Sequence, residues 1–319
     1  MIAALLVLAY AIVVAVWIPP VLRRLTAAGI SARLGLTAWV TAMASVLACA
    51  VTVLRFLIDA AIAGWPGLAE AVCRSVTGRA CAPAVYRSAV FGLTLGCIAI
   101  LAAAAAGVTA WRYGRRVQRA QRQTRAHAEA ARIAGRRMPA AGQAVVLDEP
   151  QPAAYCVPGR PATIVLTSGA LAVLDSEQLG AVLAHERAHL AGHHHLLLTL
   201  TRALPAIFPA VPLFTAGPAE AARLAEMCAD DRAARASGRH ILLAALLTMG
   251  TGRAVPAPAL AATATAITAR VQRLLEPPRH ARRAGTAAAL LAITILLTLA
   301  TGLGAFFVGP LAAHLAILT

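Results

Sequence analysis

Four long apolar stretches separate the polar parts of the chain. They are Ile2–Ile18, Leu36–Leu57, Ala89–Trp111 and Ala284–Val308. A helix needs about 20 apolar residues to cross the hydrocarbon core of a bilayer, so the pattern predicts about four transmembrane helices. The first stretch follows Met1 with no basic segment and no clear cleavage site, and we expect it to stay as a span and not to be removed as a signal peptide.

Between the third and fourth stretches the pattern becomes that of a small folded domain. Residues 112–137 are rich in arginine, glutamine and alanine, which predicts a helix that leaves the bilayer along anionic headgroups. Ala144–Leu147 and Thr163–Thr167 are aliphatic or β-branched runs, and we expect both to be strands. Asp175, followed by Gln178, is a good N-cap for the next helix. The predicted fold is mainly α, with an α+β domain between membrane spans.

Composition supports the membrane assignment. Hydrophobic residues make up 60% of the chain and charged residues 13%, which is typical of a polytopic protein. All 29 basic residues are arginines, against 13 acidic residues. The sequence contains neither an aromatic-interleaved basic stripe nor zinc-finger cysteine spacing, so we expect no direct binding of nucleic acid.

The positions of the arginines predict the orientation. Arginines concentrate directly after the third span and directly before the fourth, at Arg112, Arg115, Arg116, Arg119, Arg122, Arg125, Arg279, Arg282 and Arg283. Because cytoplasmic segments carry the excess of basic residues, residues 112–283 are expected to form a cytoplasmic domain. Residues 1–111 then hold three spans and an outer loop, and residues 284–319 hold the fourth span and a short outer tail. Both termini are expected outside.

Two of the six cysteines lie in the expected outer loop. The spacing of Cys73 and Cys81 along the sequence suits a small disulfide-closed loop in an oxidising compartment. The other cysteines lie in spans or in the cytoplasmic domain, and we expect them to be unpaired.

The strongest chemical signal is the run His185-Glu186-Arg187-Ala188-His189. On a helix, His185 and His189 lie one turn apart on the same face, so both imidazoles can bind one zinc ion. Glu186, next to the first ligand, is placed to take a proton from the water that attacks a peptide bond. This arrangement is typical of a zinc peptidase.

Such a site needs one more protein ligand, and the sequence offers two. His195 completes the metzincin pattern H-E-x-x-H-x-x-G-x-x-H, although three consecutive histidines make that match unsurprising. Glu226 is the alternative that we favour, because Asp230 lies one turn further on the same predicted helix. There Asp230 can accept a hydrogen bond from the second ring nitrogen of a ligand histidine.

Two further features remain open at the level of sequence. An oxyanion needs a donor, and Arg232, His194 and His240 are all candidates. The apolar stretch 193–214 is nearly long enough to be another span, but a crossing would put His185 and Glu226 on opposite sides of the bilayer. We expect a helix and hairpin on or dipping into the inner leaflet.

These residues together resemble a known class of proteases. The runs 162–171 and 174–189, followed by Glu226 and Asp230, are similar to the integral-membrane gluzincins of the BlaR/MecR antirepressor type, and more loosely to HtpX/Ste24-like membrane peptidases. The basic-apolar stretch 270–275 is also similar. The resemblance implies a zincin-like fold, zinc ligands His185, His189 and Glu226, general base Glu186 and a supporting carboxylate at Asp230. BlaR/MecR sensors carry a penicillin-binding domain after the fourth span, which this chain is expected to lack.

The sequence thus predicts a membrane-bound, zinc-dependent endopeptidase that acts at the cytoplasmic face. By resemblance, its protein substrate is a DNA-binding transcriptional repressor. One alternative is an HtpX-like protease for quality control of membrane proteins. The other is a non-catalytic membrane metal sensor that uses the histidine run 193–195, against which the intact Glu186 argues, because a binding site needs no general base.

Overall fold

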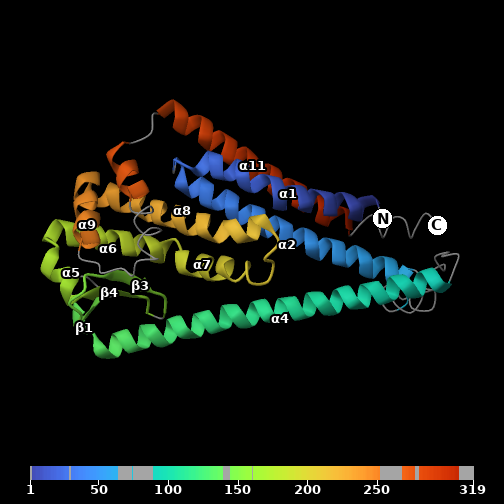
Figure 1. Cartoon of the computed structure of the whole chain (residues 1–319), viewed down its shortest axis with the longest axis horizontal. Coiled ribbons are helices and arrows are strands. Elements are labelled where there is room, and N and C mark those ends of the chain that lie inside the picture. Colours follow the sequence, from blue (N-terminus) through green and yellow to red (C-terminus); the bar gives the residue numbers. More distant parts are fainter. Residues whose placement is uncertain are drawn as a thin grey trace.

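The chain folds into an elongated, mainly helical molecule, seen here in a computed structural model that describes residues 2–28, 30–63, 74, 89–138, 144–159, 161–251, 268–276 and 280–308. Four helices are long and apolar enough to cross a membrane: α1 (Ile2–Thr26), α2 (Ala32–Ala63), α4 (Ala89–Ala134) and α11 (His280–Val308). A small mixed sheet and shorter helices occupy the end of the molecule opposite the N-terminus (Figure 1). The predicted polytopic α protein with an α+β domain is confirmed.

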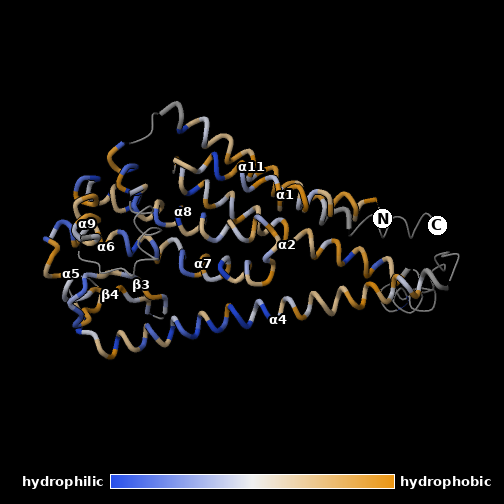
Figure 2. The backbone as a smooth tube through the Cα atoms, viewed as in Figure 1, coloured by the Kyte–Doolittle hydropathy of each residue, from blue (hydrophilic) through white to orange (hydrophobic). Residues whose placement is uncertain are grey.

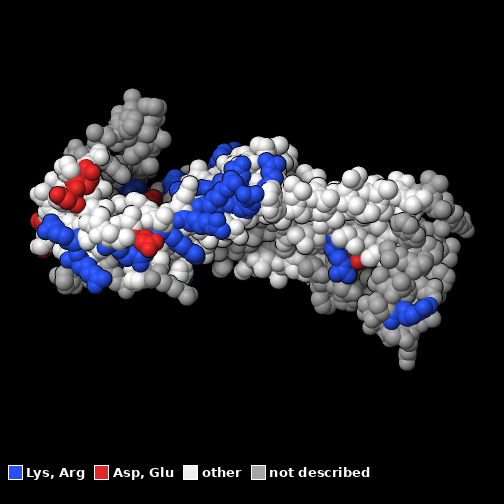
Figure 3. All heavy atoms as spheres, turned by 90° about the horizontal axis from the view of Figure 1, so that it is seen from below, with Lys and Arg blue, Asp and Glu red and all other residues white. Residues whose placement is uncertain are grey.

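Helix α4 joins the membrane part to the sheet without a break over 46 residues. Figure 2 shows its hydropathy changing from apolar to polar midway, and Figure 3 shows the basic side chains gathered there. The predicted helix over residues 112–137 is present up to Ala134, where it continues the axis of the third span, and its course relative to the lipid headgroups stays a prediction. Alanine, arginine and glutamine are strong helix formers, so nothing in this run ends the helix at the membrane boundary.

The sheet has four strands in the order β1-β2-β4-β3. They are β1 (Arg136–Met138), β2 (Ala144–Leu147), β3 (Ala154–Val157) and β4 (Thr163–Thr167). Strands β2 and β4 pair in parallel, while β1 and β3 are antiparallel edge strands. The two central strands are the two that the sequence predicts. Every residue of β4 is buried, which explains its aliphatic and β-branched composition.

Helices cover both faces of this sheet. Val145 and Val165 pack against Ala128 and Ala131 of α4. Ile164 and Leu166 point the other way, toward Leu183 of the next long helix, α6 (Ser176–Ala191). Along the chain, the short helix α5 (Ser168–Val173) connects β4 to α6.

Helix α6 begins where the sequence predicts. The side chain of Asp175 is its N-cap and accepts a hydrogen bond of 2.8 Å from the backbone N–H of Gln178. Three more helices follow: α7 (His194–Arg202), α8 (Pro212–Ser237) and α9 (Arg239–Thr251). Residues 268–275 are also helical. The stretch 193–214 is thus a helix, a turn and the start of a second helix, and it does not form one continuous span.

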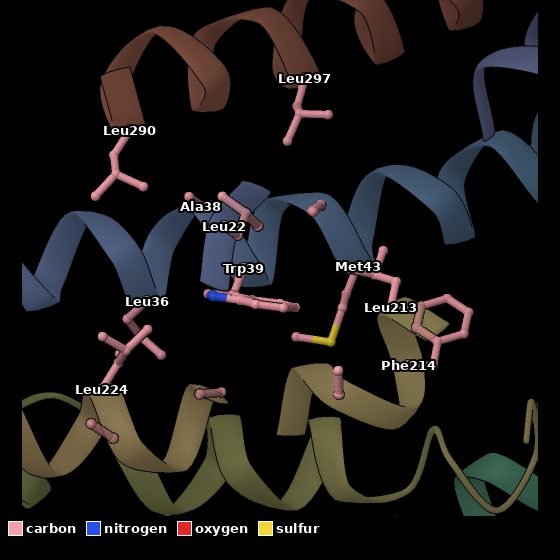
Figure 4. Packing of buried hydrophobic residues seen from close by; sticks show 14 of the residues in the cluster. Leu22, Leu36, Ala38, Trp39, Met43, Leu213, Phe214, Leu224, Leu290 and Leu297 are labelled. Carbon is pink, nitrogen blue, oxygen red and sulfur yellow. The ribbon is translucent and has the colours of Figure 1, made fainter. Parts of the chain in front are cut away.

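The largest buried cluster fixes α8 against the second span. Trp39 and Met43 of α2 face Leu213, Phe214 and Leu224 of α8, as Figure 4 shows. The two helices approach closely, because a Cβ atom on Gly217 would lie 2.6 Å from the Met43 sulfur. This packing holds α8 at a fixed depth relative to the membrane spans, and α8 carries two of the predicted site residues.

Candidate metal centre

Helix α6 presents two histidines to one point. His185 and His189 lie one turn apart, and their Nε2 atoms are 3.1 Å from each other. Both rings are largely buried, with 11% and 12% of their side chains exposed. Two imidazole nitrogens at this separation, in a site largely closed to solvent, are suited to share one cation.

Helix α8 supplies a carboxylate to the same point. Glu226 Oε2 lies 3.5 Å from His185 Nε2, and Glu226 Oε1 lies 3.5 Å from His189 Nε2. The ligand atoms of these three residues all lie within 4.8 Å of one another, as a bound metal ion requires. His195 lines the same cavity but is not a member of this group. Two imidazoles and one carboxylate fit a metal ion with an open coordination position.

A buried ion pair supports the first histidine. Asp230, with only 1% of its side chain exposed, places Oδ1 3.1 Å from His185 Nδ1. Arg270 donates to both oxygens of Asp230, at 2.7 and 2.6 Å. Its third nitrogen lies 3.3 Å from Glu226 Oε2. The arginine therefore contacts both carboxylates beside the ligand histidines.

The second histidine has its own support. His194 Nδ1 lies 3.0 Å from His189 Nδ1. His193 adopts a left-handed backbone conformation, with φ of 50°, and this residue turns the chain from α6 into α7 so that His194 faces back. Gly192 leaves room for the imidazole, since a Cβ atom there would overlap the ring of His194.

A cavity of about 370 Å³ opens beside these residues and contains the predicted general base. Glu186 is 8% exposed, and burial raises the pKa of its carboxyl above the ordinary value. Cys156 of β3 lies beside it, and burial together with the Glu186 charge raises the pKa of that thiol to about 12. The thiol is therefore protonated at neutral pH, while the carboxylate is more basic than one in water.

The pKa values around the ligands follow from burial opposed by charge. Burial alone would raise the pKa of Glu226 and of Asp230, but His185 and Arg270 outweigh it and hold both at about 2. Burial disfavours the charged form of His185, yet the two carboxylates raise its pKa to about 9. His189 has less compensation, and burial lowers its pKa to about 4. At neutral pH both carboxylates are therefore ionised, and Arg270 together with protonated His185 balances their charge, so a metal ion that binds here takes the place of the His185 proton.

Residues 116–274 match the model of peptidase family M48. This part of the chain, which we call the M48 domain, is similar to the M48 peptidases. The match includes α6, α7, α8 and residues 268–274, which carry the two histidines and Glu186, His194, the two carboxylates and Arg270, respectively. M48 peptidases are metal-dependent, and this similarity, the four apolar helices and the His-His-Glu group together indicate a membrane-associated metallopeptidase. No solved structure shows a significant match to the chain.

The M48 domain contains site residues that sequence reasoning did not place. Arg270 was visible only as part of a basic-apolar stretch, and no local pattern connects it with Asp230, 40 residues earlier. Tyr155 and Cys156 border the catalytic cavity because β3 is an edge strand, which the sequence did not predict. His194 was one of three candidate oxyanion donors, and in the structure it contacts His189.

The other two candidate oxyanion donors do not line the cavity that contains Glu186. Arg232 lines a neighbouring cavity, and His240 lies exposed near the start of α9. Among the described residues, those that line the catalytic cavity and carry a nitrogen or hydroxyl donor outside the ligand pair are Tyr155, His195 and Arg270.

The cysteine predictions are tested only in part. Cys73 and Cys81 lie outside the described residues. Cys49, Cys97, Cys156 and Cys228 are free, as expected.

Proposed function

We propose that the protein is a zinc-dependent endopeptidase whose M48 domain acts at the cytoplasmic face of a bacterial membrane. The single observation that carries this proposal is the convergence of His185, His189 and Glu226 beside the buried Glu186. Nitrogen and carboxylate donors in this number favour zinc. When bound, zinc supplies a Lewis acid that polarises the scissile carbonyl and makes water a nucleophile near neutral pH.

The protein's own residues then divide the remaining work. Glu186 accepts the proton of the attacking water and delivers it to the leaving amine, and its raised pKa suits both steps. Asp230 orients the imidazole of His185, and His194 orients that of His189, each through the ring nitrogen that faces away from the metal site. His195 faces the cavity from α7 and is the histidine that we assign to stabilise the oxyanion, because Tyr155 is bonded to His127 and Arg270 to Asp230.

The substrate is inferred to be a polypeptide in an extended conformation. Strand β3 is at the edge of the sheet, and three of its residues, 154–156, line the catalytic cavity. An edge strand offers unpaired backbone groups with which a peptide can pair. Apolar side chains, Val182, Leu242, Leu246 and Met249, line the rest of the cavity and suit an apolar residue of that peptide. This geometry favours cleavage within a chain.

The proposed natural substrate is a small cytoplasmic DNA-binding repressor, as the BlaR/MecR resemblance implies. The arginines of α4 support a cytoplasmic site, because the third span passes directly into them. Quality control of membrane proteins is the second candidate, favoured by the packing of α8 against a membrane span. A non-catalytic metal sensor is disfavoured by the buried Glu186, which a sensor does not need.

The Glu186→Gln variant tests the mechanism. The substitution keeps the size of the side chain and removes only the proton acceptor, so the purified variant should retain about one zinc ion per chain and lose all peptide cleavage. Metal analysis and a peptide-cleavage assay on the two purified proteins measure both effects. Cleavage that persists in the variant would exclude Glu186 as the base.

The same variant identifies the substrate. Cellular proteomes that contain the wild-type protein or Glu186→Gln should differ in one full-length cytoplasmic protein if a repressor is cleaved. A difference spread over many damaged membrane proteins would favour quality control instead. Identical proteomes with the wild-type protein active in vitro would reject both substrate assignments.

A further inference from the structure

A second cavity, larger than the catalytic one, lies between the second span and the M48 domain. Its volume is about 740 Å³, and its walls come from the start of α2, the α6–α7 junction and the end of α8. Three arginines line this cavity: Arg33 on α2, and Arg232 and Arg235 on α8. Leu36, Val40 and Leu197 form its apolar part. We call this cavity the arginine groove.

The charge of the arginine groove is not balanced by the protein. Asp231 is the acidic residue among its lining residues, and that carboxylate is already bonded by Arg273, at 2.7 Å to each oxygen. Within the part of the chain that the structure describes, Arg33, Arg232 and Arg235 form no ion pair. Three unpaired guanidinium groups around one cavity favour an anionic occupant, and their planar forks match phosphate oxygens.

The arginine groove lies near the arginines that follow the third span. Tyr113, next to the first arginine of the basic part of α4, donates a hydrogen bond of 3.0 Å to the carbonyl of Leu200 on α7. Leu197 of the groove is one turn from Leu200 along the same helix. The α4 arginines mark where the third span leaves the bilayer, so the groove opens beside that boundary.

Polar and apolar lining residues are arranged in the order that a phospholipid requires. Arg33 stands at the start of α2, while Leu36 and Val40 lie one and two turns further along this span, toward the bilayer. A headgroup phosphate at Arg33, Arg232 and Arg235 would leave an acyl chain along the apolar side chains. A soluble phosphate would use the arginines but leave the apolar part unfilled.

We propose that the arginine groove binds the phosphate of an anionic phospholipid headgroup. An occupant would also touch His194, which lines the groove and contacts the ligand histidine His189 at 3.0 Å. The groove therefore connects the composition of the inner leaflet with the metal centre. This connection rests on the proposed function, whereas the binding itself does not and can be measured on a protein without peptidase activity.

The test compares lipid retention by the full-length protein purified in non-ionic detergent. Dioleoylphosphatidylglycerol and dioleoylphosphatidylcholine are added separately, and native mass spectrometry measures the lipid that each sample keeps. The wild-type protein should retain phosphatidylglycerol in preference to phosphatidylcholine. Replacing Arg33, Arg232 and Arg235 together by glutamine should weaken retention of the tightest phosphatidylglycerol by about tenfold or more, since a tenfold loss corresponds to the loss of about one charge-assisted hydrogen bond.

The matched control removes the same charge at the same membrane boundary. Arg115, Arg116 and Arg119 of α4 lie outside the groove, and their triple replacement by glutamine should leave the tightest lipid bound. Equal loss in both variants would overturn the proposal in favour of nonspecific attraction to a basic surface, and full retention in the groove variant would also overturn it. Unchanged thermal unfolding of the groove variant checks that it is folded. Binding of inorganic phosphate without binding of phosphatidylglycerol would overturn the lipid assignment.

Discussion

At the scale of single residues, the metal centre depends on charged groups that are buried in the protein. Asp230 contacts a ligand histidine on one side and Arg270 on the other, and its side chain is 1% exposed. A buried charge is tolerable only when it is paired and hydrogen-bonded. The position of Asp230, one helical turn after Glu226 on α8, is therefore as restricted in sequence as the positions of the metal ligands.

The third ligand can be identified by metal content. Glu226→Ala should lower the zinc affinity of the purified protein by orders of magnitude, because it removes the carboxylate that lies 3.5 Å from both ligand histidines. His195→Ala should leave metal content nearly unchanged, since His195 lies in the cavity but outside the ligand group. Zinc analysis after dialysis against a weak chelator measures both. The reverse order would favour the metzincin arrangement.

Two arginines in one short helix allow a matched comparison of ion pairs. Arg270→Gln leaves Asp230 buried without its partner and should reduce stability by about 3 kcal/mol. Arg273→Gln breaks a pair with the more exposed Asp231, and its effect should stay within about 1 kcal/mol. Chemical denaturation in detergent, followed by intrinsic fluorescence, compares the two. Similar losses in both variants would show that burial does not decide the cost.

At the scale of elements, the helices and strands that a local sequence pattern specifies are the ones that the sequence predicts. Asp175 and Gln178 specify the start of α6, and the two central strands carry the aliphatic runs of fully covered strands. The edge strands were not predicted, because Arg136–Met138 is mostly exposed and Ala154–Val157 is half-buried, so neither shows a clear alternation. The edge strand β3 was therefore missed as a wall of the catalytic cavity.

The junction between α6 and α7 is an element whose shape the site requires. In Gly192→Ala the new methyl group would overlap the ring of His194 and displace it from His189, so metal affinity should fall by roughly 10 to 100-fold, the usual cost of a lost supporting contact. Gly180→Ala is the control in the same helix. It has open space around its Cβ position and should stabilise α6 by up to about 1 kcal/mol without changing metal affinity.

Competition with a fluorescent zinc chelator measures metal affinity in both glycine variants. Equal affinity in Gly192→Ala and the wild-type protein would show that His194 does not position His189.

At the scale of the whole molecule, the site is assembled from distant parts of the chain. Asp230 meets His185 from a separate helix, and Arg270 reaches Asp230 from 40 residues further on. The spacing of the spans and the H-E-x-x-H motif could be recognised in the sequence, because each is a local pattern. The pairing of Arg270 with Asp230 could not, because it depends on how α8 packs against α2 and against residues 268–275.

The orientation of the whole molecule can be tested by labelling. In a variant without native cysteines, a cysteine at Gln121 should be shielded from a membrane-impermeant thiol reagent in intact cells, because the α4 arginines stay inside. A cysteine at Gly78, which lies outside the described residues, should be labelled. Permeabilised cells provide the control, in which both positions should react. The opposite pattern would place the M48 domain outside and exclude a cytoplasmic substrate.

The unbroken course of α4 has a mechanical consequence. One end of this helix begins at Ala89 among the spans, and the other packs on β2, β3 and β4. A helix of 46 residues is about 69 Å long, so as a lever pivoting at one end it moves the other by roughly 1 Å for each degree of tilt. If an event on the far side of the bilayer tilted α4 by about three degrees, the other end of the helix would move by roughly the length of a hydrogen bond. Strand β3, which borders the catalytic cavity, would shift with it.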